Sequence, residues 1–385
     1  MKVSRAWNLK SQVQATLLGM AALAVTVLGG CTSKSQQGSA GSGTAATTAA
    51  TAPVRELHIF IWSDYISDDF IKQFEKENHA KVVLDFFSSN EEMLAKVQAT
   101  VQSNSRGYDL VSPSDYMSGN MIKLGLLQPL DHSKLTFLTE YGKEFQNPTY
   151  DPGLTHVVPF SWGTSGLAVQ TKLFSKFAPG LDLSKGLSWK TLFEDARFSK
   201  QVTLLDDAKE VLHVALLIQG KKWATATEAD VRSAFTYLKA HKQNVRLFTS
   251  EPKPVMLNEE CALCQTFSGD ALKVMKETAD VKYVIPEEGA TLWTDNLAIP
   301  KNAADPALAL LFMNKFLEKQ AARNFTENTF FPSPNAEAMK LLDPKLTSNL
   351  SIFPAPKTFS KLSYLVERPQ LLLVIDQLWT EFKSQ

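Results

Sequence analysis

Apolar strand-like runs alternate with amphipathic helical segments between residues 57 and 124 of this chain. Short runs rich in β-branched and aromatic residues predict strands, and apolar residues three and four positions apart predict the helices between them. This alternation is typical of a parallel sheet with helices on both of its faces. We expect strands at 57–62, 82–86 and 108–111, and helices at 69–77, 89–103 and 116–124.

The pattern changes at residues 157–166, where small residues separate two extended stretches. We interpret this segment as a crossing between two lobes, because hinges are short segments that absorb changes in backbone dihedral angle. A second set of elements follows, and residues 293–299 cross back. The expected elements are strands at 202–205, 261–266 and 283–286, and helices at 207–219, 228–241, 306–319 and 371–382.

The residues from Val54 onward exceed what one hydrophobic core usually organises, which also favours two lobes. We therefore predict an α/β fold of two lobes, each a mostly parallel sheet flanked by helices, with a ligand cleft between the lobes. The predicted boundaries are 54–163 with 294–331 for lobe 1, and 164–293 with 332–385 for lobe 2.

Residues 1–30 have the pattern of an export signal. Three basic residues precede an apolar run at 15–28, which is too short to remain as a membrane-spanning helix. The sequence Leu-Gly-Gly before Cys31 resembles a bacterial lipobox, so we expect cleavage there and a lipid on the thiol; a stray cysteine in an ordinary signal peptide is the alternative. Residues 31–53 are mostly Ser, Gly, Ala, Thr and Gln, a composition typical of flexible tethers. We predict a periplasmic or cell-surface lipoprotein, anchored to the membrane.

The charges and the other cysteines exclude several classes of function. Without residues 1–30, the 40 acidic residues exceed the basic ones by three, a balance that does not favour a nucleic-acid partner. Cys261 and Cys264 lie in a short apolar run, which favours buried thiols, with a short-range disulfide as the alternative. The six histidines are scattered and no second cysteine pair occurs, so we expect neither a metal nor a cofactor.

Acidic and aromatic residues gather where the predicted strands end. In open α/β sheets, ligands bind in the crevice beyond these ends. Carboxylates offset the desolvation of an ammonium group, and aromatic faces attract its charge, so the set suits an organic cation. At two junctions a purely structural role is the alternative. Trp62 and Tyr65 would pack at the rim of the core while Asp64 caps the next helix, and Asp207 and Glu210 would form a capping box. The candidates are Trp62, Asp64, Tyr65, Ser114, Tyr116, Asp207, Glu210, Phe267, Asp270, Trp293, Asp295 and Phe331.

Six blocks in order resemble the periplasmic polyamine-binding proteins of bacterial ABC transporters. They begin with Trp62-Ser-Asp-Tyr65 and Tyr108-Asp-Leu-Val-x-Pro-Ser114, and the others start at Phe160, Asp206, Trp293 and Phe331. The resemblance covers nearly all of 57–345. It implies a two-lobed protein that closes on a linear polyamine, binding each ammonium with acids and the carbon chain with aromatic residues.

Transferred position by position, the resemblance makes every candidate above a ligand-binding residue and Asp295 the main ammonium partner. Asp270 matches an acid of the putrescine-preferring branch. Phe267 and Phe331 stand where the family usually has Trp and Tyr, and Leu365 stands where spermidine binders place a Gln. The departures at Phe331 and Leu365 make the site more apolar. Because Asp270 and Trp62-Ser-Asp-Tyr65 resemble the putrescine-preferring branch, we expect putrescine to be favoured over spermidine.

The resemblance also implies a monomer that delivers its ligand to an ABC permease and performs no chemistry. One rival is a same-fold binding or sensing protein for another organic cation or amino acid. The other is an exported hydrolase with paired carboxylates, although no sequence motif of a hydrolase nucleophile or zinc site occurs.

Overall fold

The computed structural model describes residues 54–384, which belong to one compact unit, Pro53–Gln385. The predicted signal peptide, the linker and the lipidation site at Cys31 lie outside the described residues. Within the described part, none of the helices has the length and apolar character that crossing a membrane requires.

The strands of residues 54–384 form one nine-stranded sheet in the order β2-β1-β3-β9-β4-β7-β5-β6, with β8 also paired to β4. The pairs β1–β2, β1–β3, β5–β6 and β5–β7 are parallel, whereas every pair made by β4 or β9 is antiparallel. The strands are β1 (Arg55–Ile61), β2 (Ala80–Phe86), β3 (Leu110–Val111), β4 (Val157–Gln170), β5 (Val202–Leu205), β6 (Val245–Thr249), β7 (Leu263–Phe267), β8 (Val281–Val284) and β9 (Thr291–Ala298).

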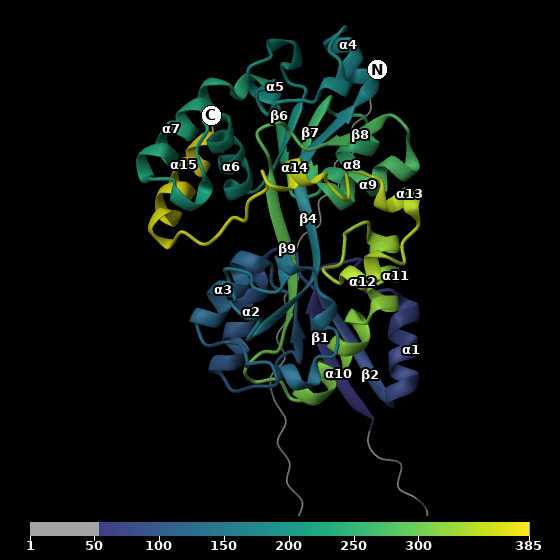
Figure 1. Ribbon diagram of the computed structural model, residues 1–385. Coiled ribbons are helices and arrows are strands. Elements are labelled where there is room, and N and C mark those ends of the chain that lie inside the picture. Colours follow the sequence, from purple (N-terminus) through teal and green to yellow (C-terminus); the bar gives the residue numbers. More distant parts are fainter. Residues whose placement is uncertain (1–53, 385) are drawn as a thin grey trace, which may run out of the picture. The chain divides into compact units, whose positions relative to one another are not determined.

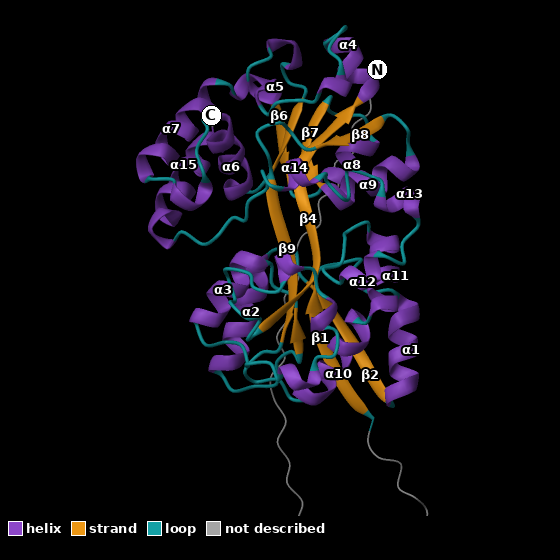
Figure 2. Cartoon of the chain, in the orientation of Figure 1, coloured by secondary structure: helices purple, strands orange, loops and turns teal. Residues whose placement is uncertain are grey.

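Strands β4 and β9 link the two groups of parallel strands, as Figures 1 and 2 show. We call the group around β1–β3 lobe 1 and the group around β5–β7 lobe 2. The crossing, predicted as two extended stretches separated by small residues, is a single continuous strand, β4, and all fourteen of its residues are buried. Gly163 of β4 is required because a Cβ there would lie 2.3 Å from the indole ring of Trp293 on β9.

The helices lie on both faces of the strands in each lobe (Figure 2). They are α1 (Asp68–Asn78), α2 (Asn90–Gln102), α3 (Asp115–Lys123), α4 (Thr171–Phe177), α5 (Lys190–Phe193), α6 (Ala208–Ile218), α7 (Glu228–Ala240), α8 (Pro252–Leu257), α9 (Ser268–Glu277), α10 (Pro306–Leu317), α11 (Lys319–Thr329), α12 (Ala336–Met339), α13 (Pro344–Thr347), α14 (Pro356–Phe359) and α15 (Leu372–Ser384).

Each lobe has its own hydrophobic core. In lobe 1, Phe74, Phe312 and Phe316 pack beneath one face of the sheet, and a smaller cluster around Phe60 packs on the other. Strand β1 is therefore buried on both faces, which is typical of a parallel sheet covered by helices. The core of lobe 2 surrounds Trp189 and includes residues of α6, α7 and α15. The proposed boundaries of the lobes remain a prediction.

The elements named from the sequence occur within two residues of their predicted ends. Strand β6 and helices α4, α5, α8, α9 and α11 were not predicted. Gly269 lies in the first turn of α9. Glycine is needed there because a Cβ would lie 2.1 Å from the ring of Phe331. Cys261 and Cys264 are free and buried, which confirms the prediction of buried thiols.

Candidate ligand-binding site

Asp295 is the centre of the candidate site. It lies on β9, is only 4% exposed, and accepts hydrogen bonds from the Tyr65 hydroxyl (2.6 Å to Oδ2) and the Ser114 hydroxyl (2.7 Å to Oδ1). Asn90 positions Ser114 by donating to its Oγ and accepting from its backbone N–H. Burial raises the pKa of Asp295 to about 6, although the hydrogen bonds from the two hydroxyls oppose the rise. The predicted trio of Tyr65, Ser114 and Asp295 is thus brought together from three distant segments.

Four of the aromatic candidates form a continuous row of edge-to-face contacts. The ring of Phe331 lies 5.9 Å from that of Tyr65 and 5.0 Å from that of Trp293, and Phe267 lies 6.1 Å from Trp293. The indole nitrogens of Trp62 and Trp293 are buried without a hydrogen-bond partner. This row runs from lobe 1 to lobe 2 and provides aromatic faces and edges next to the central carboxyl group.

Glu210 is buried in a network of neutral hydroxyl groups. Its Oε1 accepts from Ser165 of β4 and its Oε2 from Thr291 of β9, both at 2.9 Å, and His213 contacts the same Thr291. Burial and the nearby charge of Asp207 raise the pKa of Glu210 to about 8. Asp207 is the N-cap of α6 and is exposed, but Glu210 does not complete a capping box. Glu210 instead joins α6 to β4 and β9, the two strands that link the lobes.

The buried acid Asp115 follows Ser114 directly, and we had not included it among the candidates. Its Oδ1 accepts from the Tyr116 backbone N–H at 2.6 Å, whereas its Oδ2 is buried without a partner. Burial raises the pKa of Asp115 to about 8; the charge of Asp295 adds to the rise and that of Lys209 opposes it. Its position at the same strand end was the only sequence signal, since nothing distinguished it from an ordinary first-turn acid.

Tyr116 does not contact Asp295. Its hydroxyl donates to Glu91 Oε1 at 3.3 Å, and its ring faces Lys209 of α6. It lines a cavity of about 280 Å³ together with Asp115 and with Glu367, which lies in the segment before α15. Tyr116 therefore belongs to a separate end of the candidate site.

Asp64 and Asp270 both interact electrostatically with Lys273 of α9. The carboxylate of Asp64 lies 3.8 Å from the Lys273 ammonium and is 80% exposed. Asp64 does not cap α1, since the N-cap is Ser67. Burial raises the pKa of Asp270, and Lys273 opposes this rise.

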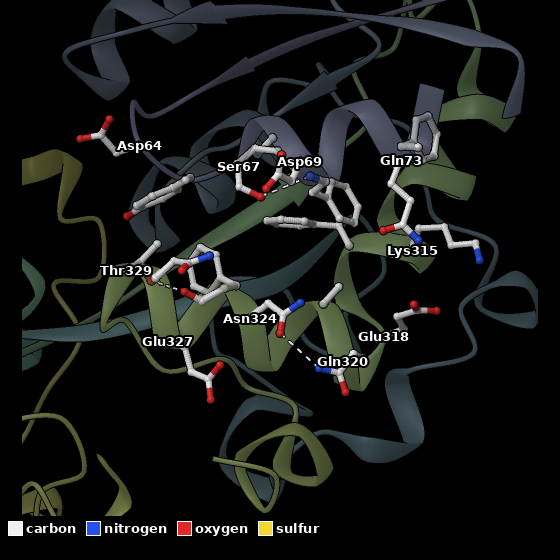
Figure 3. Close-up of a pocket in the computed structure, with 18 of the residues that line it drawn as sticks. Asp64, Ser67, Asp69, Gln73, Lys315, Glu318, Gln320, Asn324, Glu327 and Thr329 are labelled. Carbon is white, nitrogen blue, oxygen red and sulfur yellow. Dashed lines mark hydrogen bonds between the residues drawn. The ribbon is translucent and has the colours of Figure 1, made fainter. Parts of the chain in front are cut away.

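A larger cavity of about 610 Å³ lies between α1 and the α10–α11 segment (Figure 3). Of the predicted residues, only Asp64 and Tyr65 line it. Its remaining polar lining consists of side chains such as Gln73 and Asn324, which extend from facing helices in Figure 3. The cavity therefore lies beside the aromatic row rather than on Asp295. Among residues 54–384, no group of three acidic, histidine or cysteine side chains could hold a metal ion.

Comparison with known proteins gives a consistent result. The family model of the bacterial extracellular solute-binding proteins matches residues 69–354. Spermidine/putrescine-binding periplasmic protein 1 of Haemophilus influenzae is 32% identical over 340 residues, covering 88% of this chain and 92% of that protein. The putrescine-binding periplasmic protein SpuD of Pseudomonas aeruginosa is 30% identical over 358 residues, covering 89% of this chain and 96% of SpuD.

Solved structures give the same fold. The spermidine/putrescine ABC transporter substrate-binding protein PotD of Streptococcus pneumoniae aligns with a TM-score of 0.76 and 27% identity, covering 86% of this chain and 99% of PotD. The predicted two-lobed binding-protein fold is thus confirmed, and these relatives are substrate-binding transport proteins rather than enzymes. The chain belongs to the bacterial extracellular solute-binding protein family.

Proposed function

We propose that this protein captures a linear polyamine, prefers putrescine to spermidine, and delivers it to an ABC permease. The observation that carries the proposal is the buried carboxyl group of Asp295 beside the aromatic row of Tyr65, Phe331, Trp293 and Phe267. The names of the relatives support the same class of ligand.

The chemistry of the site favours a cation. Both oxygens of Asp295 accept from neutral hydroxyl groups, so its negative charge has no positive partner among the described residues that bond to it. An oxygen has two lone pairs, and each can therefore accept a further hydrogen bond from an ammonium group. The buried acids Asp115 and Glu210 nearby would repel an anionic solute when ionised.

The apolar side chains support a short ligand. Phe267 and Phe331 cover the methylene chain but offer no hydroxyl or indole N–H. Leu365 is 6% exposed and belongs to the core of lobe 2, so it offers no polar group to a second amine. A diamine requires fewer polar partners than a triamine, since each buried ammonium needs its own.

We also propose that a lipid on Cys31 holds the protein at the membrane and that the protein acts as a monomer. The near-balanced charge and the linker composition of residues 31–53 support a tethered binding protein.

Calorimetric titration of residues 54–385, freed of ligand by unfolding and refolding, tests the proposed ligand. Putrescine, cadaverine, spermidine and spermine are titrated in turn. Putrescine is expected to bind most tightly, with a dissociation constant on the order of 10⁻⁶ M. Folded protein that binds none of the four would refute the polyamine proposal, and binding of amino acids or of other organic cations instead would identify the same-fold alternative.

A further inference from the structure

Lys209 places an ammonium group of the protein itself at one end of the candidate site. From the first turn of α6 in lobe 2, its Nζ lies 3.8 Å from the ring centroid of Tyr116 in lobe 1. It also donates a hydrogen bond of 2.8 Å to Glu367 Oε1. Both side chains of the ion pair are largely buried, with 19% of Lys209 and 14% of Glu367 exposed.

The surroundings of this ammonium have the chemistry expected of a subsite for a ligand amine. An aromatic face, a carboxylate hydrogen bond and a second buried acid are the groups that stabilise a desolvated ammonium. Asp115, whose Oδ2 is buried without a hydrogen-bond partner, supplies the second acid. The cavity of about 280 Å³ beside Tyr116 is lined by both Asp115 and Glu367.

The chain itself places this subsite next to the centre of the candidate site. Asp115 and Tyr116, which line the cavity, directly follow Ser114, whose hydroxyl donates to Asp295 Oδ1 at 2.7 Å. A longer polyamine that is bound to Asp295 and extends toward Tyr116 would bring a further ammonium close to that of Lys209. Like charges in a buried site repel strongly.

We propose that Lys209 is a tethered ammonium that fills the subsite formed by Tyr116, Glu367 and Asp115, and that it thereby restricts the ligand to a short diamine. This inference rests on the proposed polyamine function and assigns its chain-length selectivity to a residue that does not contact the diamine. A surface ion pair would leave selectivity unchanged, so selectivity is the property to measure.

The variant Lys209→Met tests the proposal, because it keeps the apolar stem and removes the ammonium. Emptying the subsite should let a third ligand ammonium bind to Glu367 and Tyr116. We expect the ratio of spermidine to putrescine affinity to rise at least about tenfold, the size of one buried ammonium contact. Lys221→Met is the matched control, since the Lys221 ammonium also pairs with a carboxylate, at 2.9 Å from Asp230, but its side chain is 50% exposed and does not line this cavity. The control should leave the ratio within about twofold of the parent, because surface charges contribute little.

Each outcome has one meaning. A parent protein that binds no polyamine refutes the proposed function. A parent that binds putrescine, with an unchanged ratio in folded Lys209→Met, overturns the inference alone. An equal gain for both ligands also overturns it, because Lys209 would then act only by holding the two lobes together. Thermal unfolding verifies that the variant is folded, and Lys209→Gln replaces it if the methionine variant is unstable.

Discussion

Asp295→Asn should reduce polyamine binding without harming the fold. An amide has nearly the shape of the carboxyl group, and its oxygen can still accept from Tyr65 or from Ser114, whose hydroxyls now hold the two carboxyl oxygens. The negative charge is lost. Removing one partner of a buried charged pair typically costs about 2–5 kcal/mol, and the retained acceptor favours the lower end, about 2–3 kcal/mol or a 30- to 150-fold weaker dissociation constant.

The stability of the ligand-free protein should change in the opposite direction. Burial raises the pKa of Asp295 from 3.8 to about 6, and this difference corresponds to about 3 kcal/mol of destabilisation when the group is ionised in the folded state. Asparagine has no charge to bury, so the ligand-free variant should unfold at the same temperature as the parent or at a higher one at pH 7.5. A loss of affinity together with retained stability separates a binding role from a structural one.

Calorimetry with putrescine and thermal unfolding without ligand make the two measurements. Asp151→Asn is the control, since Asp151 is also buried and accepts from the backbone N–H groups of His156 and Val157. It should lower stability and leave affinity unchanged. If Asp295→Asn binds putrescine within threefold of the parent, the placement of the site on Asp295 is wrong.

Three further predictions concern the same buried groups. Because protonated Asp295 cannot form an ion pair with an ammonium, putrescine affinity should fall up to about tenfold per pH unit below pH 6, as measured by calorimetry between pH 5 and 8. Gly269→Ala forces a Cβ into the ring of Phe331 and should destabilise the protein by about 1–3 kcal/mol in denaturant unfolding, whereas Gly119→Ala meets ordinary contacts and should not. Burial raises the pKa of Asp115 to about 8, so this group binds more protons when folded than when unfolded, and its contribution makes stability fall between pH 4 and pH 8. Unfolding of Asp115→Asn over this range should show a weaker decline than the parent, and an equal decline would exclude Asp115 as its source.

Local patterns were sufficient to predict most of the longer elements and to place candidate residues at the ends of strands. Trp293 and Asp295 share one face of a strand because side chains alternate along it, and strand ends in open α/β sheets carry ligand residues. Local patterns did not identify the cap of α1. The sequence offered Asp64 as a cap for this helix, but the N-cap in the structure is Ser67.

Long-range contacts explain what the sequence could not predict. The hydrogen bond between Ser114 and Asp295 joins residues 181 positions apart, and no local pattern indicates it. The need for glycine at position 269 also comes from a distant segment, since a Cβ there would meet the ring of Phe331. The direction of Lys209 toward Tyr116 likewise depends on where α6 and α3 lie in the folded chain.

The partners of each acid distinguish carboxylates whose charge is compensated within the protein from those whose charge is not. Asp305 accepts two hydrogen bonds of 2.7 Å from Arg55, so its charge is already compensated by a guanidinium and has little to gain from a ligand ammonium. Asp295 and Glu210 accept only from neutral hydroxyl groups, which orient the carboxyl group without cancelling its charge. Burial then makes an unpaired charge costly, as their raised pKa values indicate, and an incoming cation relieves that cost. The affinity for a polyamine would therefore arise as much from the absence of a basic partner at Asp295 as from the carboxylate itself.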